Sequence, residues 1–408
     1  MNVKIKKSKL KGSLTTRPSK SFAHRYLIAS ALSDSESTIS NVDFSNDIIA
    51  TLNCIHAYGK KHFREFDKHI VRFTNESTKN FNPTFDCNES GTTLRIFMPI
   101  AMQKYEKTNF IGSDRLIERG VDIYEQIFKY VKFYKNKFNI ETNGLIDAGK
   151  YELPGNISSQ YISGLLYALP LLNGDSEIKV TTTLESKNYV LMTLEVLKNY
   201  GIKIESNIDL YKNDNESNQN LTFKISGNQK YVAKDYSIEG DYSNAAFIDA
   251  FNYFDSEITL NGLNPHSLQS DKVYKEHFES LNNTNATIDI SNCIDLGPIL
   301  ITFATLKNGA HFINTERLKI KESDRGNVIA EELRKCGADI EVLDNEIIVN
   351  KKELHMPTTT LYSHNDHRIA MSLSLLSTMF DIEIEGSECV NKSYPGYFDD
   401  LESLGAIL

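Results

Sequence analysis

The chain has 408 residues, of which 40% are hydrophobic and 24% are charged, and its formal net charge is −9. This length favours two domains of about 200 residues each. The longest apolar stretches, at 162–172 and 369–380, are too short for a membrane span of roughly 20 residues, and the negative net charge argues against non-specific nucleic-acid binding.

One pattern recurs six times: a short polar stretch runs directly into an apolar, helix-like segment. In chain order the polar stretches are Ser19-Lys20-Ser21, Ser90-Gly91-Thr92, Ser158-Ser159-Gln160, Asp241-Tyr242-Ser243, Asp295-Leu296-Gly297 and Asn365-Asp366-His367. Their starts are about 70 residues apart, the mark of an internal repeat. An amphipathic helix followed by a turn and a strand recurs between them, at 194–205, at 332–342 and less clearly at 277–290.

These repeats predict an α/β (α+β) protein of six βαβαββ-like units, arranged as two domains of three units. The first helix of each unit is apolar on nearly all faces, so we expect it to be buried at a domain centre. The polar segment 212–220 predicts a surface turn between strands.

The polar helix starts have two interpretations. Unpaired N–H groups and a partial positive charge at a helix N-terminus suit a bound anion. However, Ser, Thr, Asp and Asn are also ordinary N-cap residues with no further role. Cations near these starts favour the anion site.

The cations stand next to helix starts and turns. They are Lys20, Arg25, Arg95, Arg115, Arg119, Lys321, Arg325, Arg368 and Lys392. Lys321 and Arg325 are four residues apart, which predicts a shared helix face, although a mixed-charge run is also typical of a solvated face. In an acidic protein such a set predicts a focused positive cleft for a multiply anionic small molecule. Phosphate-loop and dinucleotide motifs are missing from the sequence.

The cysteines bear on metal sites and on the cellular compartment. They are Cys54, Cys87, Cys293, Cys336 and Cys389, with no CxxC pair among them. This argues against a disulfide framework and a structural zinc site, and it favours a reducing compartment. We therefore expect a globular protein of the cytoplasm.

Taken together, the motifs SKSFAHR, ESGTTLR, SSQ, EGDYSNAAF, KIKESDR, NDHR and NKSYPGYF resemble those of the 5-enolpyruvylshikimate-3-phosphate synthases in order and spacing. The resemblance extends from about residue 10 to 405, and the pair KESDR and NDHR is its most specific part. It implies transfer of the enolpyruvyl group of phosphoenolpyruvate to the 5-hydroxyl of shikimate 3-phosphate through a tetrahedral intermediate, with release of phosphate.

The resemblance also implies site residues. Shikimate 3-phosphate would be bound by Lys20, Ser21, Arg25, Ser158, Ser159, Gln160, Ser186, Tyr189, Asp295 and Lys321. Phosphoenolpyruvate would be bound by Lys20, Gly91, Arg115, Gln160, Arg325, Arg368 and Lys392. The catalytic residues would be Asp295, which accepts the proton of the 5-hydroxyl, Glu322, which protonates the vinyl carbon, and Lys20, which contacts both substrates.

The domain arrangement follows from the same resemblance. It implies an inserted three-unit domain at 19–238, a second three-unit domain formed by 1–18 and 239–408, and an active site in the cleft between them. No metal or organic cofactor is expected, and we expect a monomer. The family is the target of glyphosate. The chain departs from the usual family pattern at Pro18-Ser19, at Glu89-Ser90 and at Gly120.

Two alternatives remain at this point. A sister enzyme of similar architecture transfers enolpyruvyl to UDP-N-acetylglucosamine, but it commonly carries a reactive cysteine, and the matching segment 111–124 here has none. A catalytically inactive binding protein on the same fold would require loss of Lys20, Asp295 or Glu322, and all three are present.

Overall fold

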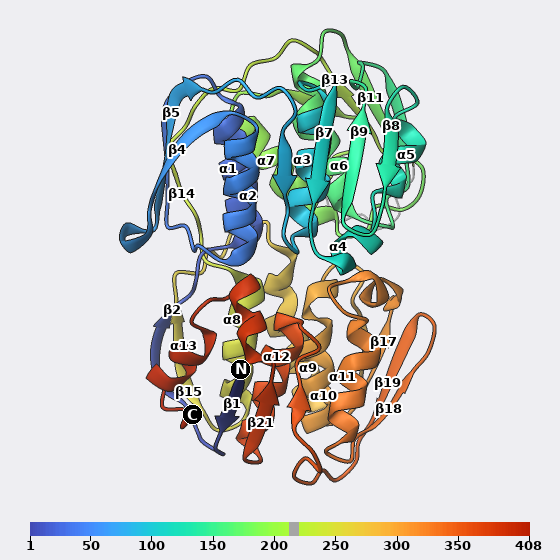
Figure 1. Cartoon of the computed structure of the whole chain (residues 1–408). Coiled ribbons are helices and arrows are strands. Elements are labelled where there is room, and N and C mark those ends of the chain that lie inside the picture. Colours follow the sequence, from blue (N-terminus) through green and yellow to red (C-terminus); the bar gives the residue numbers. More distant parts are fainter. Residues whose placement is uncertain (212–219) are drawn as a thin grey trace. The chain divides into compact units, whose positions relative to one another are not determined.

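The computed structural model describes residues 1–211 and 220–408 (Figure 1). These residues form two compact units, Lys20–Ile238 and the combination of Met1–Ser19 with Glu239–Leu408. We call the first the inserted unit and the second the terminal unit. Nearly all of the segment predicted as a surface turn, 212–220, lies outside the described residues. In the part of the chain that the structure describes, no helix has the length and apolar character to cross a membrane.

The inserted unit combines helices with small sheets. Its helices are α1 (Lys20–Leu32), α2 (Asn46–Ala57), α3 (Gly91–Met102), α4 (Asp114–Glu118), α5 (Asp122–Ile127), α6 (Ser159–Ala168) and α7 (Lys187–Asn199). Its strands are β3 (Ser37–Ser40), β4 (Lys60–Glu65), β5 (Ile70–Ser77), β6 (Thr84–Asp86), β7 (Lys107–Ile111), β8 (Lys132–Lys135), β9 (Asn139–Asn143), β10 (Lys150–Leu153), β11 (Ser176–Val180), β12 (Ile204–Ser206), β13 (Thr222–Ile225) and β14 (Tyr236–Ser237).

The terminal unit also combines helices with small sheets. Its helices are α8 (Tyr242–Asp249), α9 (Tyr274–Asn283), α10 (Gly297–Leu306), α11 (Arg325–Arg334), α12 (His367–Ser374) and α13 (Tyr397–Ser403). Its strands are β1 (Asn2–Ile5), β2 (Lys11–Thr15), β15 (Glu257–Asn261), β16 (Ala286–Asp289), β17 (Ala310–Ile313), β18 (Asp339–Val342), β19 (Glu346–Asn350), β20 (Leu361–Tyr362) and β21 (Ile382–Glu385).

Four of the sheets share one topology. In the sheet ordered β10-β11-β13-β12, β10 and β11 are parallel, whereas β13 is antiparallel to both β11 and β12. The sheets β6-β7-β9-β8, β16-β17-β19-β18 and β14-β3-β5-β4 repeat this order and these directions. Parallel neighbours need a crossover connection, usually a helix, and α3, α6 and α10 supply it in three of the sheets. The fold is therefore mixed α/β with several small four-stranded sheets.

The strand that precedes each passage of the chain between the units pairs within the unit that the chain is leaving. β2 leads directly into α1 of the inserted unit, yet it pairs in parallel with β15 of the terminal unit. Likewise, β14 leads into α8 of the terminal unit but pairs in parallel with β3 of the inserted unit. The last residue of the first terminal-unit segment is hydrogen-bonded to the first residue of the second segment: the Ser19 N–H donates to the Glu239 carbonyl over 2.7 Å. The sequence pattern predicts the helices but not these strand pairings.

The predicted polar helix starts are real helix starts, and several of them carry an N-cap. Ser90 accepts a hydrogen bond from the Thr93 N–H at the start of α3, and Ser158 accepts one from Gln160 in α6. Asp241, Asp324 and Asp366 cap α8, α11 and α12 in the same way. These caps satisfy N–H groups that the helix leaves unpaired.

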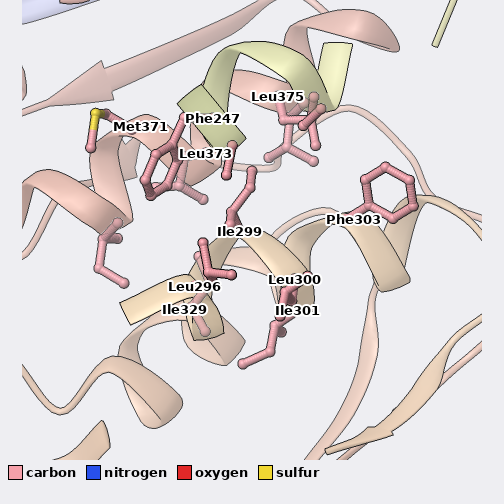
Figure 2. Packing of buried hydrophobic residues seen from close by; sticks show 14 of the residues in the cluster. Phe247, Leu296, Ile299, Leu300, Ile301, Phe303, Ile329, Met371, Leu373 and Leu375 are labelled. Carbon is pink, nitrogen blue, oxygen red and sulfur yellow. The ribbon is translucent and has the colours of Figure 1, made fainter. Parts of the chain in front are cut away.

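The apolar helices form the cores, as their composition predicts. In the terminal unit α10 packs against α9, α11 and α12, and it is buried from Gly297 to Thr305. Figure 2 shows Phe247 of α8, Ile299 of α10 and Leu373 of α12 in this buried cluster. Burial of each such side chain contributes about 1.5–3 kcal/mol. This packing holds the starts of α10, α11 and α12 at one place, where the charged residues lie.

In the inserted unit α3 packs against α6, and α6 against α7. Gly164 of α6 allows the close approach to α3, because a Cβ built there would lie 2.3 Å from the Tyr124 hydroxyl and 2.6 Å from the Arg95 carbonyl oxygen. The contact therefore brings the N-terminal ends of these helices, with Arg95 and Gln160, close together.

Candidate active site

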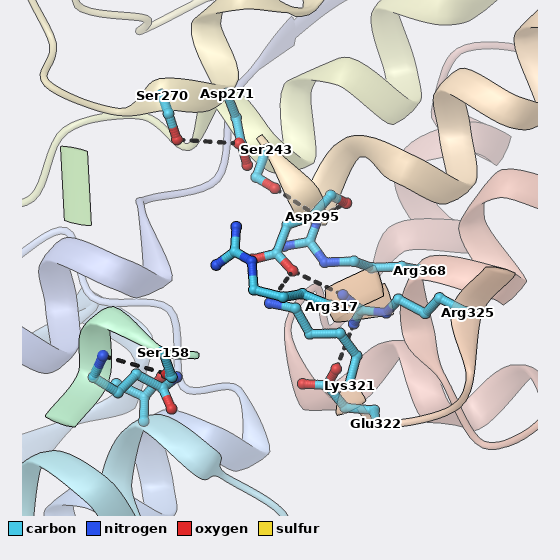
Figure 3. A network of polar contacts seen from close by, with 12 residues as sticks. Ser158, Ser243, Ser270, Asp271, Asp295, Arg317, Lys321, Glu322, Arg325 and Arg368 are labelled. Carbon is cyan, nitrogen blue, oxygen red and sulfur yellow. Dashed lines mark hydrogen bonds and ion pairs between the residues drawn. The ribbon is translucent and has the colours of Figure 1, made fainter. Parts of the chain in front are cut away.

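Arg325 is the centre of a charged cluster in the terminal unit. It is the first residue of α11, and its side chain is only 1% exposed. Its Nη1 donates to Asp295 Oδ1 over 2.7 Å and its Nη2 to Glu322 Oε2 over 2.6 Å (Figure 3). Its Nε donates to Asp366 Oδ2 over 2.8 Å. One buried guanidinium thus contacts three carboxylates, which supply the partners that a buried charge requires.

The two predicted catalytic carboxylates, those of Asp295 and Glu322, therefore accept hydrogen bonds from the same guanidinium. Asp295 is in a 3₁₀ helix, Ile294–Leu296, directly before α10, and Glu322 is in the turn before α11. Their side chains are 19% and 22% exposed, unlike that of Arg325. Both carboxylates can thus be reached from outside while the cation that links them is buried.

Cations determine the ionisation of Asp295. Burial alone would raise the pKa of this carboxyl, but Lys321, Arg368 and Arg325 together hold it well below its ordinary value. The Lys321 Nζ lies 3.0 Å from Asp295 Oδ1. Burial lowers the pKa of Lys321, and the nearby Arg325 acts in the same direction while Asp295 opposes it. These cations therefore favour the ionised form of Asp295.

One prediction about this cluster is wrong. Lys321 and Arg325 do not share a helix face, because Lys321 has extended backbone angles (φ −85°, ψ −164°) before α11 begins. The side chain of Asp324 accepts a hydrogen bond from the Asn327 N–H, and this cap starts the helix at Arg325. The two cations nevertheless meet at Asp295, from a turn and a helix respectively.

Arg368 and Lys392 complete the cluster. Arg368 follows the cap residue Asp366 in α12, and its Nη1 donates to the Asp295 carbonyl over 2.9 Å and to the Ser243 hydroxyl over 2.6 Å. The Lys392 Nζ donates to the carbonyl of Asn365. Five of the predicted residues, Asp295, Lys321, Glu322, Arg325 and Arg368, are thus joined by direct contacts, and Lys392 holds the segment just before α12.

Arg25 is the buried cation of the inserted unit. It is 2% exposed and donates to the Thr193 hydroxyl and to the Tyr189 carbonyl, each over 2.9 Å. Its guanidinium carbon lies 5.8 Å from the centre of the Tyr189 ring, and its Nη1 donates to the Ser21 carbonyl over 2.8 Å. The structure therefore brings Ser21, Arg25 and Tyr189 together.

Lys20 and the serines lie at helix starts of the same unit. Lys20 is the first residue of α1, and its Nζ donates to Asp47 Oδ2 over 2.8 Å. Ser158 and Ser159 begin α6, and Ser186 precedes α7 in a left-handed conformation with φ 53°. The Ser186 carbonyl accepts the N–H of Tyr189 over 3.0 Å, which links Ser186 to the surroundings of Arg25.

A second group lies where α3 meets α6. Gln160 accepts a hydrogen bond from Arg95 Nη1 over 3.0 Å and donates to the Thr92 hydroxyl over 3.0 Å. A Cβ built at Gly91 would lie 3.0 Å from Arg95 Nη1 and 3.1 Å from Arg119 Nη2, so glycine lets both guanidinium groups lie against the helix start. Gly91 and Gln160 are thus in one place with two arginines.

The predicted Arg115 has a different environment. It lies in α4, its side chain is 45% exposed, and its Nη1 lies 3.9 Å from Glu118. Arg95 and Arg119 are the guanidinium groups that the structure places against Gly91. Both stand out in the sequence as cations next to turns, but neither was assigned a role at the site.

Other residues of the site also have no assigned role in the sequence analysis. Asp366 is fully buried and contacts Arg325, and Asp47 contacts Lys20. Arg317 is 9% exposed, appears beside Lys321 in Figure 3 and contributes to the lowered pKa of Lys321. An aspartate directly before an apolar helix is a recognisable cap signal, so Asp366 could have been found. Asp47 and Arg317 have no such local signal.

A further acidic group has a structural role. The ligand atoms of Glu331, Glu332 and His364 lie within 4.8 Å of one another in the described residues. However, Glu332 already accepts hydrogen bonds from Lys335 Nζ over 2.7 Å and from the Tyr362 N–H over 2.8 Å. It also lies 2.9 Å from His364 Nε2. This buried carboxylate therefore ties the segment before α12 to α11.

Known proteins resemble this chain over its whole length. A family model of EPSP synthase (3-phosphoshikimate 1-carboxyvinyltransferase) matches residues 5–401. The 3-phosphoshikimate 1-carboxyvinyltransferase of Clostridium perfringens (strain ATCC 13124) is 43% identical, covering 99% of this chain and 98% of that protein. The enzyme of the same name from Clostridium botulinum (strain Eklund 17B) is 41% identical, covering 98% of this chain and 97% of that protein.

Solved structures show the same fold. The EPSP synthase from Acinetobacter baumannii matches with a TM-score of 0.76 at 20% identity, over 99% of this chain and 98% of that one. The enolpyruvyl transferase NikO from Streptomyces tendae matches with a TM-score of 0.78 at 13% identity, over 100% and 97%.

The architecture is therefore that of the enolpyruvyl transferases. Within this class the chain belongs to the EPSP synthase (3-phosphoshikimate 1-carboxyvinyltransferase) family. Its reaction, in the shikimate pathway, transfers the enolpyruvyl group of phosphoenolpyruvate to shikimate 3-phosphate and releases phosphate. The family and activity predicted from the sequence are confirmed.

Proposed function

We propose that Asp295, Glu322 and Lys20 carry out this enolpyruvyl transfer, and that it proceeds through a tetrahedral intermediate. The observation that carries the proposal is the shared contact of Asp295 and Glu322 with the buried Arg325. General acid–base chemistry needs two groups held at fixed positions. A buried guanidinium that contacts both carboxylates provides that support.

In the first step Glu322 donates a proton to the methylene carbon of phosphoenolpyruvate. The 5-hydroxyl oxygen of shikimate 3-phosphate forms a bond to the adjacent carbon, and its proton passes to Asp295. The product is a tetrahedral intermediate that still carries the phosphate. Asp295 can accept this proton once the phosphate and carboxylate groups of the substrates draw Lys321 and Arg368 toward themselves, because these two cations hold its pKa down in the absence of other anions.

In the second step the new methyl group loses a proton to a carboxylate, and the carbon–oxygen bond to phosphate breaks. The electron pair of the C–H bond forms the enol double bond, and phosphate leaves. Lys20, Arg325, Arg368 and Lys392 would neutralise the charge that develops on the departing phosphate, a stabilisation that is strongest where water is excluded.

Substrate binding divides among the remaining residues. We assign shikimate 3-phosphate to Ser21, Arg25, Ser158, Ser159, Gln160, Ser186, Tyr189 and Lys321, and phosphoenolpyruvate to Gly91, Arg115, Gln160, Arg325, Arg368 and Lys392, with Lys20 at both. The helix starts at Gly91 and Ser159 support this assignment, because the partial positive charge of a helix N-terminus suits phosphate and carboxylate oxygens. The surroundings of Gly91 favour Arg95 and Arg119 as additional cations of the phosphoenolpyruvate site.

The arrangement of six repeated units in two domains, with the active site in a cleft between them, stays a prediction, as does a monomer working in the cytoplasm. The sheet topology that four of the sheets share supports the arrangement in repeated units. The five cysteines, all buried and free, support a reducing compartment. Size-exclusion chromatography with light scattering tests the monomer, and a mass of two chains would refute it.

Phosphate release from the purified protein tests the proposed chemistry. We expect release with phosphoenolpyruvate plus shikimate 3-phosphate, and none when UDP-N-acetylglucosamine replaces shikimate 3-phosphate. Rapid quench of a single turnover in strong base should trap the intermediate, because a ketal phosphate is labile in acid, and its yield should fall in Asp295→Asn. Full activity in that variant would remove Asp295 from the mechanism.

A further inference from the structure

A carboxylate that the proposed mechanism does not use lies close to the charged cluster. Asp271 is in a 3₁₀ helix, Ser270–Val273, and is 2% exposed. The Ser270 hydroxyl donates to Asp271 Oδ1 over 3.4 Å, and the Ser243 hydroxyl favours the ionised form of the same carboxyl group, lowering its pKa. Figure 3 shows Asp271 beside Ser243, on the side of the cluster where Arg368 approaches. All of these residues belong to the terminal unit.

Ser243 connects Asp271 to Arg368. Arg368 Nη1 donates to Ser243 Oγ over 2.6 Å. A guanidinium can only donate, and a hydroxyl has one proton together with lone pairs that accept. Since Ser243 accepts from Arg368, its own proton remains for Asp271. Arg368 therefore donates to Ser243, whose own proton is available to the Asp271 carboxylate beside it.

We propose that Asp271 is a positioning residue, which acts through Ser243 to hold the guanidinium of Arg368 in the orientation that binds phosphoenolpyruvate. This inference rests on the role given to Arg368 in the proposed function. Arg368 has two other anchors, the carbonyl of Asp295 at 2.9 Å and the Asp295 carboxylate at 3.8 Å from Nη2. The Ser243 contact is the shortest of these and comes from α8, which also places the Phe247 ring centre 5.9 Å from the guanidinium carbon of Arg368.

The hold on Arg368 should depend on pH. The titratable and charged groups facing Asp271 are Asp241, Cys293, Asp295 and Arg368. Burial, assisted by Asp295 and opposed by Arg368 and Ser243, raises the pKa of Asp271 to about 6. Below that pH Asp271 is protonated and no longer attracts the Arg368 guanidinium. Its carboxyl proton can then donate to the Ser243 hydroxyl, in competition with Arg368. Arg368 is then held less firmly.

The first test is Ser243→Ala, with Ser270→Ala as the matched control. Both variants remove a hydroxyl beside Asp271, but only the first removes the hydrogen-bond acceptor of Arg368. With phosphate release as the assay, Ser243→Ala should raise the KM for phosphoenolpyruvate roughly tenfold, the effect expected for a hydrogen bond to a charged group. The KM for shikimate 3-phosphate should stay within about twofold, and Ser270→Ala should match the wild type.

The second test is Asp271→Asn, which keeps the size of the side chain and an acceptor oxygen but no longer titrates. Substrate phosphates themselves titrate near pH 6, so the readout is the difference between the variant and the wild type. In kcat/KM for phosphoenolpyruvate, the acidic decline of the wild type should contain a component near pH 6 that Asp271→Asn lacks. The corresponding profile for shikimate 3-phosphate should be the same in both proteins.

The outcomes separate this inference from the function on which it rests. A folded Ser243→Ala variant with unchanged KM for phosphoenolpyruvate would overturn the role of Asp271 alone. If Ser243→Ala and Ser270→Ala raised the KM values for phosphoenolpyruvate and shikimate 3-phosphate equally, the role of Asp271 would also be overturned. Such a result would indicate a general structural role for the two serines. A wild-type protein that releases no phosphate would overturn the proposed function and this inference together. Thermal unfolding curves establish that each variant is folded.

Discussion

Arg325 and Asp366 form a buried ion pair with two hydrogen bonds, from Nε to Oδ2 over 2.8 Å and from Nη2 to Oδ1 over 3.3 Å. Their side chains are 1% and 0% exposed. Asp366 also caps α12 by accepting the N–H of Arg368 over 3.0 Å. One carboxylate thus ties the start of α11 to the start of α12, and the cations of the site depend on it.

Replacing Asp366 with Asn should lower the free energy of unfolding by about 3 kcal/mol, because it leaves part of the buried Arg325 charge without its partner. Ser323→Ala is the matched control, since it removes only a hydroxyl that donates to Asp366 over 3.0 Å and should cost about 1 kcal/mol. Urea denaturation measures both values. Equal costs for the two variants would contradict a special role for the ion pair.

Stability should fall in acid partly through the same carboxylates. Burial opposes the ionisation of Asp366 and Asp295, yet the cations, with Arg325 the largest for Asp366, lower the pKa of both. The unfolded-state pKa of aspartate is about 3.9. Because the folded values lie lower, this stabilisation is complete above about pH 4 and is lost as the pH falls below it. Urea denaturation between pH 2 and 5 should show a shallower decline for Asp366→Asn than for the wild type, and parallel curves would refute the assignment.

Replacing Glu322 with Gln should reduce turnover by roughly two orders of magnitude or more, a typical effect of losing a general acid. The amide oxygen can still accept a hydrogen bond from Arg325, so binding of shikimate 3-phosphate should change little. Isothermal titration calorimetry and steady-state kinetics measure the two quantities separately. If turnover remained at the wild-type level, Glu322 would have no part in proton transfer.

Replacing Arg25 with Ala should raise the KM for shikimate 3-phosphate. Arg25→Lys is the informative comparison, because it keeps the charge but cannot reproduce the contacts of the guanidinium with Thr193 and Tyr189. We expect its KM to lie between those of Arg25→Ala and the wild type. An increase confined to the KM for phosphoenolpyruvate would assign Arg25 to the other substrate.

The sequence predicted much of the local structure. The polar stretches at Ser90, Ser158, Asp241 and Asp366 do begin helices, because an N-cap depends on residues a few positions apart. The apolar helices that follow are buried, as their composition requires. The shared helix face of Lys321 and Arg325 was wrong for an equally local reason: the cap formed by Asp324 starts the helix four residues later than the charge spacing suggested.

By itself, then, the sequence determined where the helices begin, which of them are buried, and to which family the chain belongs. Only the tertiary structure decided that Arg325 meets Asp295 and Asp366, which are 30 and 41 residues away, and that Asp271 lies beside Ser243, the acceptor of Arg368. The physical reason is that caps and hydrophobic periodicity act within one element. The partners of a buried charge are set by the packing of α8, α10, α11 and α12 around a common core, and no short stretch of sequence specifies that packing.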